Sequence, residues 1–302
     1  SVLWSAHSDS SGSRSTGTVH RRDGPVLPLP AKGRQDKKRV HRGAEKGRRR
    51  TDSGNQGNAG KERRKASEEA AKKEKIRSFY QNLAKDGLSI IGEFKNASPS
   101  LGKIESRITL EERMEDYTAS VDAVSCLTEE KHFLGNTDYF RKVRNLTPLP
   151  MLRKDFMIEE YQFYEAKAID ADAVLLIAAI LDDKEMYDFY QLAKELKLDV
   201  LVETHDEWEM ERALKLDADI IGINNRNLKD FTISLERTKT LSKMVPKDKI
   251  LIAESGIVRE DDVAYLADCG VSGFLIGRAF MEHENPKALA AHWKQVYKEA
   301  AK

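Results

Sequence analysis

The chain has 302 residues, 33% of them charged and 40% hydrophobic, which is typical of a soluble globular protein with one large or two small domains. No stretch approaches 18 uninterrupted apolar residues, so a membrane span is not expected. Its two cysteines, Cys126 and Cys269, lie far apart, without the spacing of a metal site or a disulfide framework, so a reducing cytoplasm is the expected location.

The net charge of +1 conceals two parts of opposite charge. Residues 1–75 carry 20 Lys and Arg against 9 Asp and Glu, whereas the remainder has a net charge of −10. Between residues 31 and 66 apolar periodicity is almost absent, so burial cannot offset the chain entropy. We therefore predict that the basic, Gly-, Ser- and Arg-rich segment 1–66 is a disordered tail and that residues 67–302 form the folded domain.

After the tail, helical and extended patterns alternate. Ile76, Phe79, Tyr80 and Leu83 have the spacing of a short amphipathic helix, and the Asp-Gly pair at 86–87 ends it. Eight strands are then predicted, beginning near Ser89, Val121, Pro150, Ala173, Asp199, Ile220, Lys249 and Gly273. Amphipathic segments such as 183–196 and 206–216 lie between them. Eight βα units in about 225 residues favour a (β/α)₈ TIM barrel over a doubly wound open sheet.

Polar residues follow the apolar runs at the ends of these strands. Glu93 and Lys95 are two residues apart and so share one face of the first strand; by themselves they fit an ordinary ion pair. The residues at the later strand ends are Lys154, Asp155, Glu203, Asn224, Asn225, Arg226, Glu254, Ser255, Gly256 and Arg278. Because the strands of such a barrel end at one mouth, this convergence predicts a catalytic site that both donates and accepts protons.

The last two strands carry a signal for phosphate. Gly256 and Gly277 stand where this fold commonly binds phosphate through backbone N–H groups, and Arg278 would add a positive charge, although each glycine alone equally fits a turn. We find no dinucleotide fingerprint, Walker loop or metal-ligand spacing, so the site is predicted to need no cofactor and no metal. His205, the one histidine near a strand tip, is interpreted as a helix-start residue.

Eight sequence blocks, in this order, resemble the indole-3-glycerol phosphate synthase family: GEFKNASPS, SCLTEEKHFLG, LRKDFMIEEYQ, ADAVLLIAAIL, LVETHDEWEMERAL, IGINNRNL, AESGI and FLIGRAFM. The resemblance extends from about Ser78 to Pro286 and implies a (β/α)₈ barrel. It also implies a reaction of tryptophan biosynthesis. In that reaction 1-(2-carboxyphenylamino)-1-deoxyribulose 5-phosphate is cyclised, decarboxylated and dehydrated to indole-3-glycerol phosphate, CO₂ and water.

The resemblance further implies roles for individual residues. Lys154 matches the general acid of ring closure, and Lys95 matches a lysine that holds the substrate carboxylate and can act as an acid in dehydration; which lysine serves which step stays open. Glu203 matches a carboxylate that assists proton removal, while Glu93 and Asn224 match groups that orient the lysines and the hydroxyl. The implied substrate-binding residues are Glu254, Ser255, Gly256, Gly277 and Arg278 at the phosphate end, and Ser98, Pro99, Phe133, Phe156, Arg226 and Leu228 elsewhere, the aromatic and aliphatic ones around the anthranilate ring.

The chain departs from the family pattern in three places. Leu101 replaces the lysine of a common Ser-Lys-Gly run, although Lys103 lies nearby, and Arg278 stands where a small residue or an acid is usual. The basic tail occupies the place of the family's N-terminal helices, which we interpret as a fused or misread upstream segment rather than a functional arm.

Two other functions are weighed against this one. A sister barrel, phosphoribosylanthranilate isomerase, uses a cysteine and an aspartate, but neither Cys126 nor Cys269 is placed for that role. A nucleic-acid-binding protein would use the basic tail, yet Trp4 is the tail's only aromatic residue for base stacking. We thus expect a phosphorylated small molecule as the partner, other enzymes of the tryptophan pathway as candidate partners, and no nucleic acid bound by the barrel.

Overall fold

The computed structural model describes Lys65 and residues 77–94, 97–98, 102–103, 109–130, 134–228 and 230–301. The predicted disorder of residues 1–66 concerns, apart from Lys65, a part of the chain outside these ranges. Among the described helices none has both the length and the apolar character to cross a membrane.

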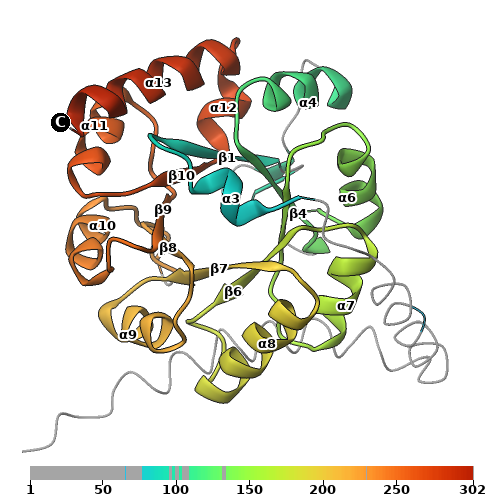
Figure 1. Cartoon of the computed structure of the whole chain (residues 1–302). Coiled ribbons are helices and arrows are strands. Elements are labelled where there is room, and N and C mark those ends of the chain that lie inside the picture. Colours follow the sequence, from blue (N-terminus) through green and yellow to red (C-terminus); the bar gives the residue numbers. More distant parts are fainter. Residues whose placement is uncertain are drawn as a thin grey trace, which may run out of the picture.

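Eight parallel strands form a closed barrel in the order β1-β10-β9-β8-β7-β6-β5-β4 (Figure 1). The strands are β1 (Ser89–Phe94), β4 (Ala123–Leu127), β5 (Met151–Lys154), β6 (Ala173–Ile177), β7 (Asp199–Thr204), β8 (Ile220–Asn224), β9 (Ile250–Glu254) and β10 (Gly273–Ile276). Because β1 pairs with both β4 and β10, the sheet has no edge, and the predicted TIM barrel is confirmed over the open sheet. Two short strands after β1, β2 (Ala97–Ser98) and β3 (Gly102–Lys103), form a separate antiparallel pair.

Helices surround the barrel (Figure 1). They are α3 (Phe79–Leu83), α4 (Leu110–Thr118), α6 (Thr137–Arg144), α7 (Tyr161–Ala168), α8 (Asp183–Glu195), α9 (Glu207–Lys215), α10 (Glu236–Leu241), the 3₁₀ helix η1 (Ser242–Met244), α11 (Glu260–Asp268), α12 (Arg278–Glu282) and α13 (Pro286–Ala300). Local capping sets several of their starts. Thr109 and Asp182 each accept the backbone N–H three residues later, in capping boxes with Glu112 and Glu185. The predicted helices at 183–196 and 206–216 are confirmed to within one residue.

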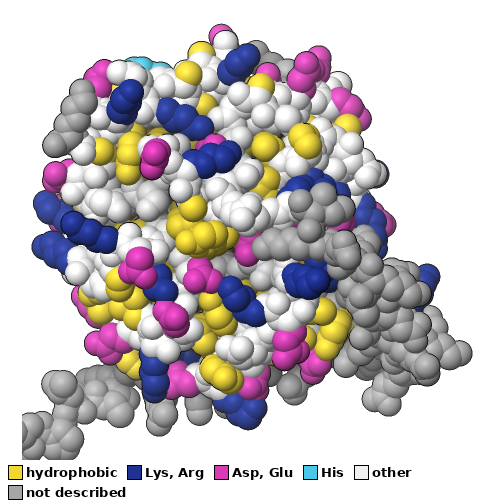
Figure 2. All heavy atoms as spheres, viewed as in Figure 1, with side chains coloured by type: hydrophobic (Ala, Val, Ile, Leu, Met, Phe, Trp, Pro, Cys, Tyr) yellow, Lys and Arg dark blue, Asp and Glu magenta, His cyan; other side chains and the backbone are white. Residues whose placement is uncertain are grey.

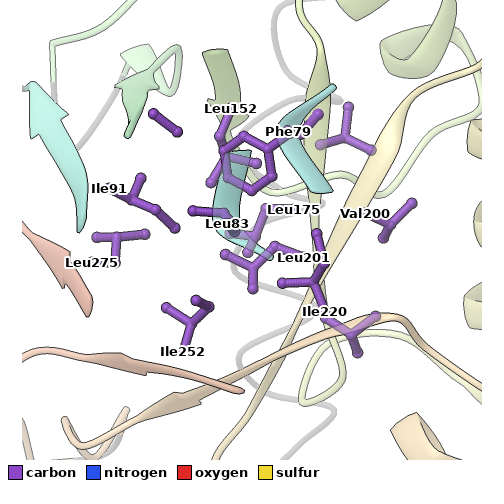
Figure 3. Packing of buried hydrophobic residues seen from close by; sticks show 14 of the residues in the cluster. Phe79, Leu83, Ile91, Leu152, Leu175, Val200, Leu201, Ile220, Ile252 and Leu275 are labelled. Carbon is purple, nitrogen blue, oxygen red and sulfur yellow. The ribbon is translucent and has the colours of Figure 1, made fainter. Parts of the chain in front are cut away.

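Inside the barrel, a charged layer and an apolar layer follow the two-residue period of a strand. On four strands an inward-facing charged residue at the carboxyl end is preceded, two positions earlier, by a fully buried aliphatic residue. The pairs are Ile91 and Glu93, Leu152 and Lys154, Leu201 and Glu203, and Ile252 and Glu254. Figure 3 shows the four aliphatic side chains around the barrel interior. The charged layer therefore rests on a packed apolar floor.

Helix α3 covers the opposite, amino-terminal end of the barrel, where it crosses the middle of the view in Figure 1. Phe79 and Leu83 are fully buried among the strand residues of the core (Figure 3). Arg77, just before the helix, donates to Asp170 at 2.7 Å and to both oxygens of the buried Asp172 at 3.0 and 3.1 Å. Acidic and basic side chains are interspersed over this face (Figure 2). The start of the described fold is thus fastened to the barrel by apolar packing and by ion pairs.

Candidate active site

The carboxyl ends of the strands bring most of the predicted catalytic residues together. Lys154 ends β5, Asn224 ends β8, and Glu93 and Glu203 lie one residue before the ends of β1 and β7. Since all four strands point the same way around one barrel, these side chains converge on its mouth. Lys95, the fifth predicted catalytic residue, lies outside the described residues.

Lys154 is held between two carboxylates. Its Nζ donates to Glu254 Oε2 at 2.9 Å and lies 3.3 Å from Glu93 Oε2. The strands that carry these carboxylates, β9 and β1, are not neighbours of β5, so the contacts cross the barrel interior. Burial favours the neutral amine, but Glu254, Glu93 and Glu203 outweigh it and raise the pKa of Lys154 above its ordinary value. Lys154 is therefore a charged proton donor in a largely buried position.

Glu254, which the sequence resemblance places at the phosphate end, contacts Lys154 in this group. Its carboxylate is almost completely buried, and its Oε1 has no hydrogen-bond partner among the described residues. Room for that oxygen exists because the neighbouring strand has a glycine at position 222. A Cβ added at Gly222 would lie only 2.4 Å from Oε1. Burial and the charges of Glu203 and Glu93 outweigh the opposing effect of Lys154 and raise the pKa of Glu254 to about 7. Glu254 can thus carry or release a proton near neutral pH.

The pKa of Glu203 is shifted downward, in the opposite direction to that of Glu254. Asn224 Nδ2 donates to Glu203 Oε1 at 3.2 Å, and His205 Nε2 lies 3.2 Å from the same oxygen. Burial alone would raise the pKa of Glu203, but His205, Lys154 and Asn224 outweigh it and lower this pKa to about 2. At neutral pH Glu203 is a fixed carboxylate.

His205 is a site residue that sequence reasoning missed. It does precede Asp206, the N-cap of α9, as expected of a helix-start residue, but its ring lies between Glu203 and Glu209. Glu209 Oε2 accepts the backbone N–H of His205 at 2.8 Å and lies 3.0 Å from His205 Nδ1. The available signal was spacing: His205 follows Glu203 by two residues in an extended chain and precedes Glu209 by four at a helix start.

The residues predicted to bind phosphate lie at two turns of the backbone, after β9 and before α12. Ser255 and Gly256, after β9, have φ values of 66° and 84°, and Gly277 precedes α12. A Cβ at Gly256 would lie 2.5 Å from Ile233 Cγ2, so glycine is needed there for space as well as for conformation. Arg278 is turned outward: its side chain is 64% exposed, and its Nε contacts Glu282 Oε1 at 2.8 Å on the same helix.

The remaining predicted residues divide into three groups. Phe156 packs half-buried against the core, and Leu228 is half-buried after β8. The backbone N–H of Arg226 donates to Asn224 Oδ1 at 3.0 Å, which fixes the amide that contacts Glu203. Pro99, Phe133 and the side chain of Ser98 lie outside the described residues.

Asp155 and Asn225, which also follow strands, form hydrogen bonds with residues outside the group around Lys154. Asp155 Oδ2 accepts from Arg153 at 3.1 Å and from Thr128 at 2.8 Å, outside the catalytic group. Asn225 bonds to Thr238 and to the Ser255 carbonyl. In the part of the chain that the structure describes, no group of three or more His, Cys, Asp or Glu side chains is arranged to hold a metal ion.

Comparison with known proteins agrees with this geometry. The family model described as "Indole-3-glycerol phosphate synthase" matches residues 53–292, a match that begins inside the predicted tail. An indole-3-glycerol phosphate synthase of Lachnospira eligens is 55% identical over 225 residues, covering 73% of this chain and 84% of that protein. One from Caldanaerobacter subterraneus is 52% identical over 205 residues, covering 68% and 80%.

Solved structures of other enzymes share only the fold. A thiamine phosphate pyrophosphorylase from Pyrococcus furiosus has a TM-score of 0.53 at 17% identity, covering 71% of this chain and 98% of its own. A 3-hexulose-6-phosphate synthase from Salmonella typhimurium has a TM-score of 0.55 at 16% identity, covering 70% and 100%. These likenesses support the barrel architecture and no particular chemistry.

Proposed function

The chain belongs to the indole-3-glycerol phosphate synthase family, and from this premise we propose how its residues perform the reaction. The enzyme is a carboxy-lyase of tryptophan biosynthesis. It closes the indole ring of 1-(2-carboxyphenylamino)-1-deoxyribulose 5-phosphate, with loss of CO₂ and water. Three tasks fall to the protein: protonating the oxygen of the ketone, accepting a proton, and holding the phosphate.

Lys154 is the proton donor of ring closure. As the aromatic carbon attacks the ketone, negative charge develops on the ketone oxygen, and a nearby ammonium group both stabilises and protonates it. The observation that carries this proposal is the position of Lys154 Nζ, 2.9 Å from Glu254 and 3.3 Å from Glu93 at the mouth of the barrel. Those two carboxylates keep the lysine charged and aim it inward.

Glu203 is the carboxylate that balances positive charge on the substrate. Loss of CO₂ restores the aromatic ring; Glu203 then accepts the proton that leaves the substrate carbon as the hydroxyl departs as water, with a proton from a lysine ammonium group. Asn224 donates a hydrogen bond to Oε1 of Glu203, and His205 Nε2 lies 3.2 Å from the same oxygen. A carboxylate with so low a pKa is a weak base in the free enzyme, so its first contribution is electrostatic. Glu254, with its pKa near neutrality, is the better placed of the two to return the proton to Lys154 between turnovers.

The phosphate is assigned to the backbone around Gly256 and Gly277, with Ser255 beside it. Positive φ at residues 255–256 turns the chain sharply after β9, as in backbone sites that bind anions through N–H groups. Arg278 is left out of this assignment because it pairs with Glu282 on the surface of α12. Association with other enzymes of the tryptophan pathway remains a prediction, tested by copurification from cells that express the pathway.

A turnover assay tests the proposal. The purified protein is mixed with the carboxyphenylamino-deoxyribulose phosphate, and the appearance of indole fluorescence is followed. Fluorescence should rise with enzyme concentration and disappear in Lys154→Met. Turnover of phosphoribosylanthranilate instead would favour the sister isomerase. Salt-sensitive retention of RNA without turnover of either compound would favour the nucleic-acid-binding alternative.

A further inference from the structure

His205 is enclosed by two carboxylates, one at each ring nitrogen. Nδ1 lies 3.0 Å from Glu209 Oε2, and Nε2 lies 3.2 Å from Glu203 Oε1. The His205 side chain is only 9% exposed, and those of Glu203 and Glu209 are 4% and 2% exposed. All three therefore lie where water competes little for their contacts.

This arrangement favours the charged form of the ring. A neutral imidazole carries one N–H, so one of its two nitrogens would have to face a carboxylate oxygen with only a lone pair. An imidazolium has an N–H on each nitrogen and is attracted to both carboxylates; its contact at Nε2 is a 3.2 Å ion pair whose angles are not those of a hydrogen bond. Glu209 is itself fixed, since the same Oε2 accepts the backbone N–H of His205 at 2.8 Å.

We infer that His205 is a permanently charged positioning residue, anchored by Glu209, that holds Glu203 ionised through a close ion pair. The inference rests on the catalytic role proposed for Glu203. His205 acts through Glu203 and needs no contact with the substrate. It extends the active site by a chain of three side chains from the mouth of the barrel to the first turn of α9.

The other charged groups around Glu203 do not make His205 redundant. Lys154, from β5, is the second cation near Glu203, but its Nζ is already held by Glu254 and Glu93. Asn224, from β8, contributes a neutral hydrogen bond.

The electrostatic directions agree with this picture. Although burial disfavours the charged ring, Glu203 and Glu209 raise the pKa of His205 to about 10, so the ring stays charged through neutral pH. A neutral side chain at position 205 would leave Glu203 desolvated, with Lys154 as its only nearby cation among the described residues, and would raise its pKa.

The first experiment examines the unaltered protein by NMR with ¹⁵N-labelled histidine. One histidine should keep both ring nitrogens protonated up to about pH 8.5, where ordinary histidines are neutral. A spectrum in which every histidine becomes neutral by about pH 7.5 overturns the inference. This readout does not depend on catalysis, so it separates failure of the inference from failure of the proposed function.

The second experiment compares pH profiles of kcat. In His205→Gln the acidic limb should move upward by about 1–3 pH units, the effect expected of removing a cation beside a carboxylate, with little change in KM. Glu209→Gln should move it in the same direction by less. The control is His292→Gln, which removes a histidine paired with Glu260 at 2.8 Å on the surface and should leave the profile unchanged. If His205→Gln lowers only the melting temperature and its profile superimposes on that of the wild type, the inference fails.

Discussion

Gly222 and Glu254 fit each other so closely that a single methyl group would collide with the carboxylate: a Cβ at Gly222 would lie 2.4 Å from Glu254 Oε1. The two residues lie on the adjacent strands β8 and β9. The glycine therefore determines where the Glu254 carboxylate can lie.

Gly222→Ala should displace Glu254 and, with it, Lys154. Misplacement of a catalytic group by about 1 Å can cost about 10²-fold in rate, so we expect a loss of that order in kcat with the fold retained. A double-mutant cycle with Glu254→Gln checks the cause. If the alanine acts through Glu254, the two losses will be far from additive.

Lys154→Met should abolish the proton donor while keeping a side chain of similar length. We expect kcat to fall about 10²–10⁴-fold, the range for a positioned acid. Lys142→Met, at an exposed position on α6, is the control and should retain full activity. Activity above a tenth of the wild-type value in Lys154→Met would refute the assignment.

Glu203→Gln preserves the shape of the side chain and removes its charge. We expect kcat to fall more than KM rises, because the charge matters most when the substrate becomes positively charged. Steady-state kinetics over a range of substrate concentrations separate the two constants. A change confined to KM would make Glu203 a binding residue.

Glu254 should shape the dependence of stability on pH. Its folded-state pKa of about 7 lies above the ordinary value of 4.5, so the folded state binds the proton more tightly than the unfolded state. Its contribution to the free energy of unfolding is fully present below pH 4.5 and is lost as the pH rises through 7. Glu254→Gln removes this loss, so the variant should gain stability relative to wild type between those pH values in urea titrations. A pH-independent difference would contradict the raised pKa.

The amino-terminal boundary of the fold can be tested by a matched pair of substitutions. Arg77→Ala removes contacts to Asp170 and Asp172 and should cost about 1–3 kcal/mol of unfolding free energy, as expected for charged hydrogen bonds. Lys85→Ala removes only a 3.9 Å exposed pair and should cost far less.

Deletion of residues 1–66 should leave the melting temperature nearly unchanged. A fall of many degrees would show that the basic segment packs on the barrel.

The fold was predictable because its signals are local. Each strand is a short apolar run bounded by polar residues, so every predicted start lies within two residues of the observed one. Closure of the barrel was predictable only from the number of units and the family resemblance. The pairing of β1 with β10 joins segments from opposite ends of the domain, and no local pattern encodes it.

The site was predictable as a list of residues but not as a set of contacts. The family resemblance grouped Glu254 with Ser255 and Gly256 at the phosphate end, and only the structure shows that its carboxylate contacts Lys154. His205 was interpreted as a helix-start residue because it follows a strand tip, and its contact with Glu203 was not foreseen. Spacing brings His205 within reach of Glu203 and Glu209, but it does not show which side chains meet across two elements.

The closure of the sheet has a consequence for the protein while it is being synthesised. Strand β1 is among the first parts of the barrel to leave the ribosome, yet one of its edges pairs with residues 273–276, which are made near the end of translation. Until then an apolar strand carries unpaired backbone groups, the arrangement most prone to wrong pairing with other chains. The pairing of these two strands is therefore the last step in closing the sheet, and the free edge of β1 is exposed until it occurs.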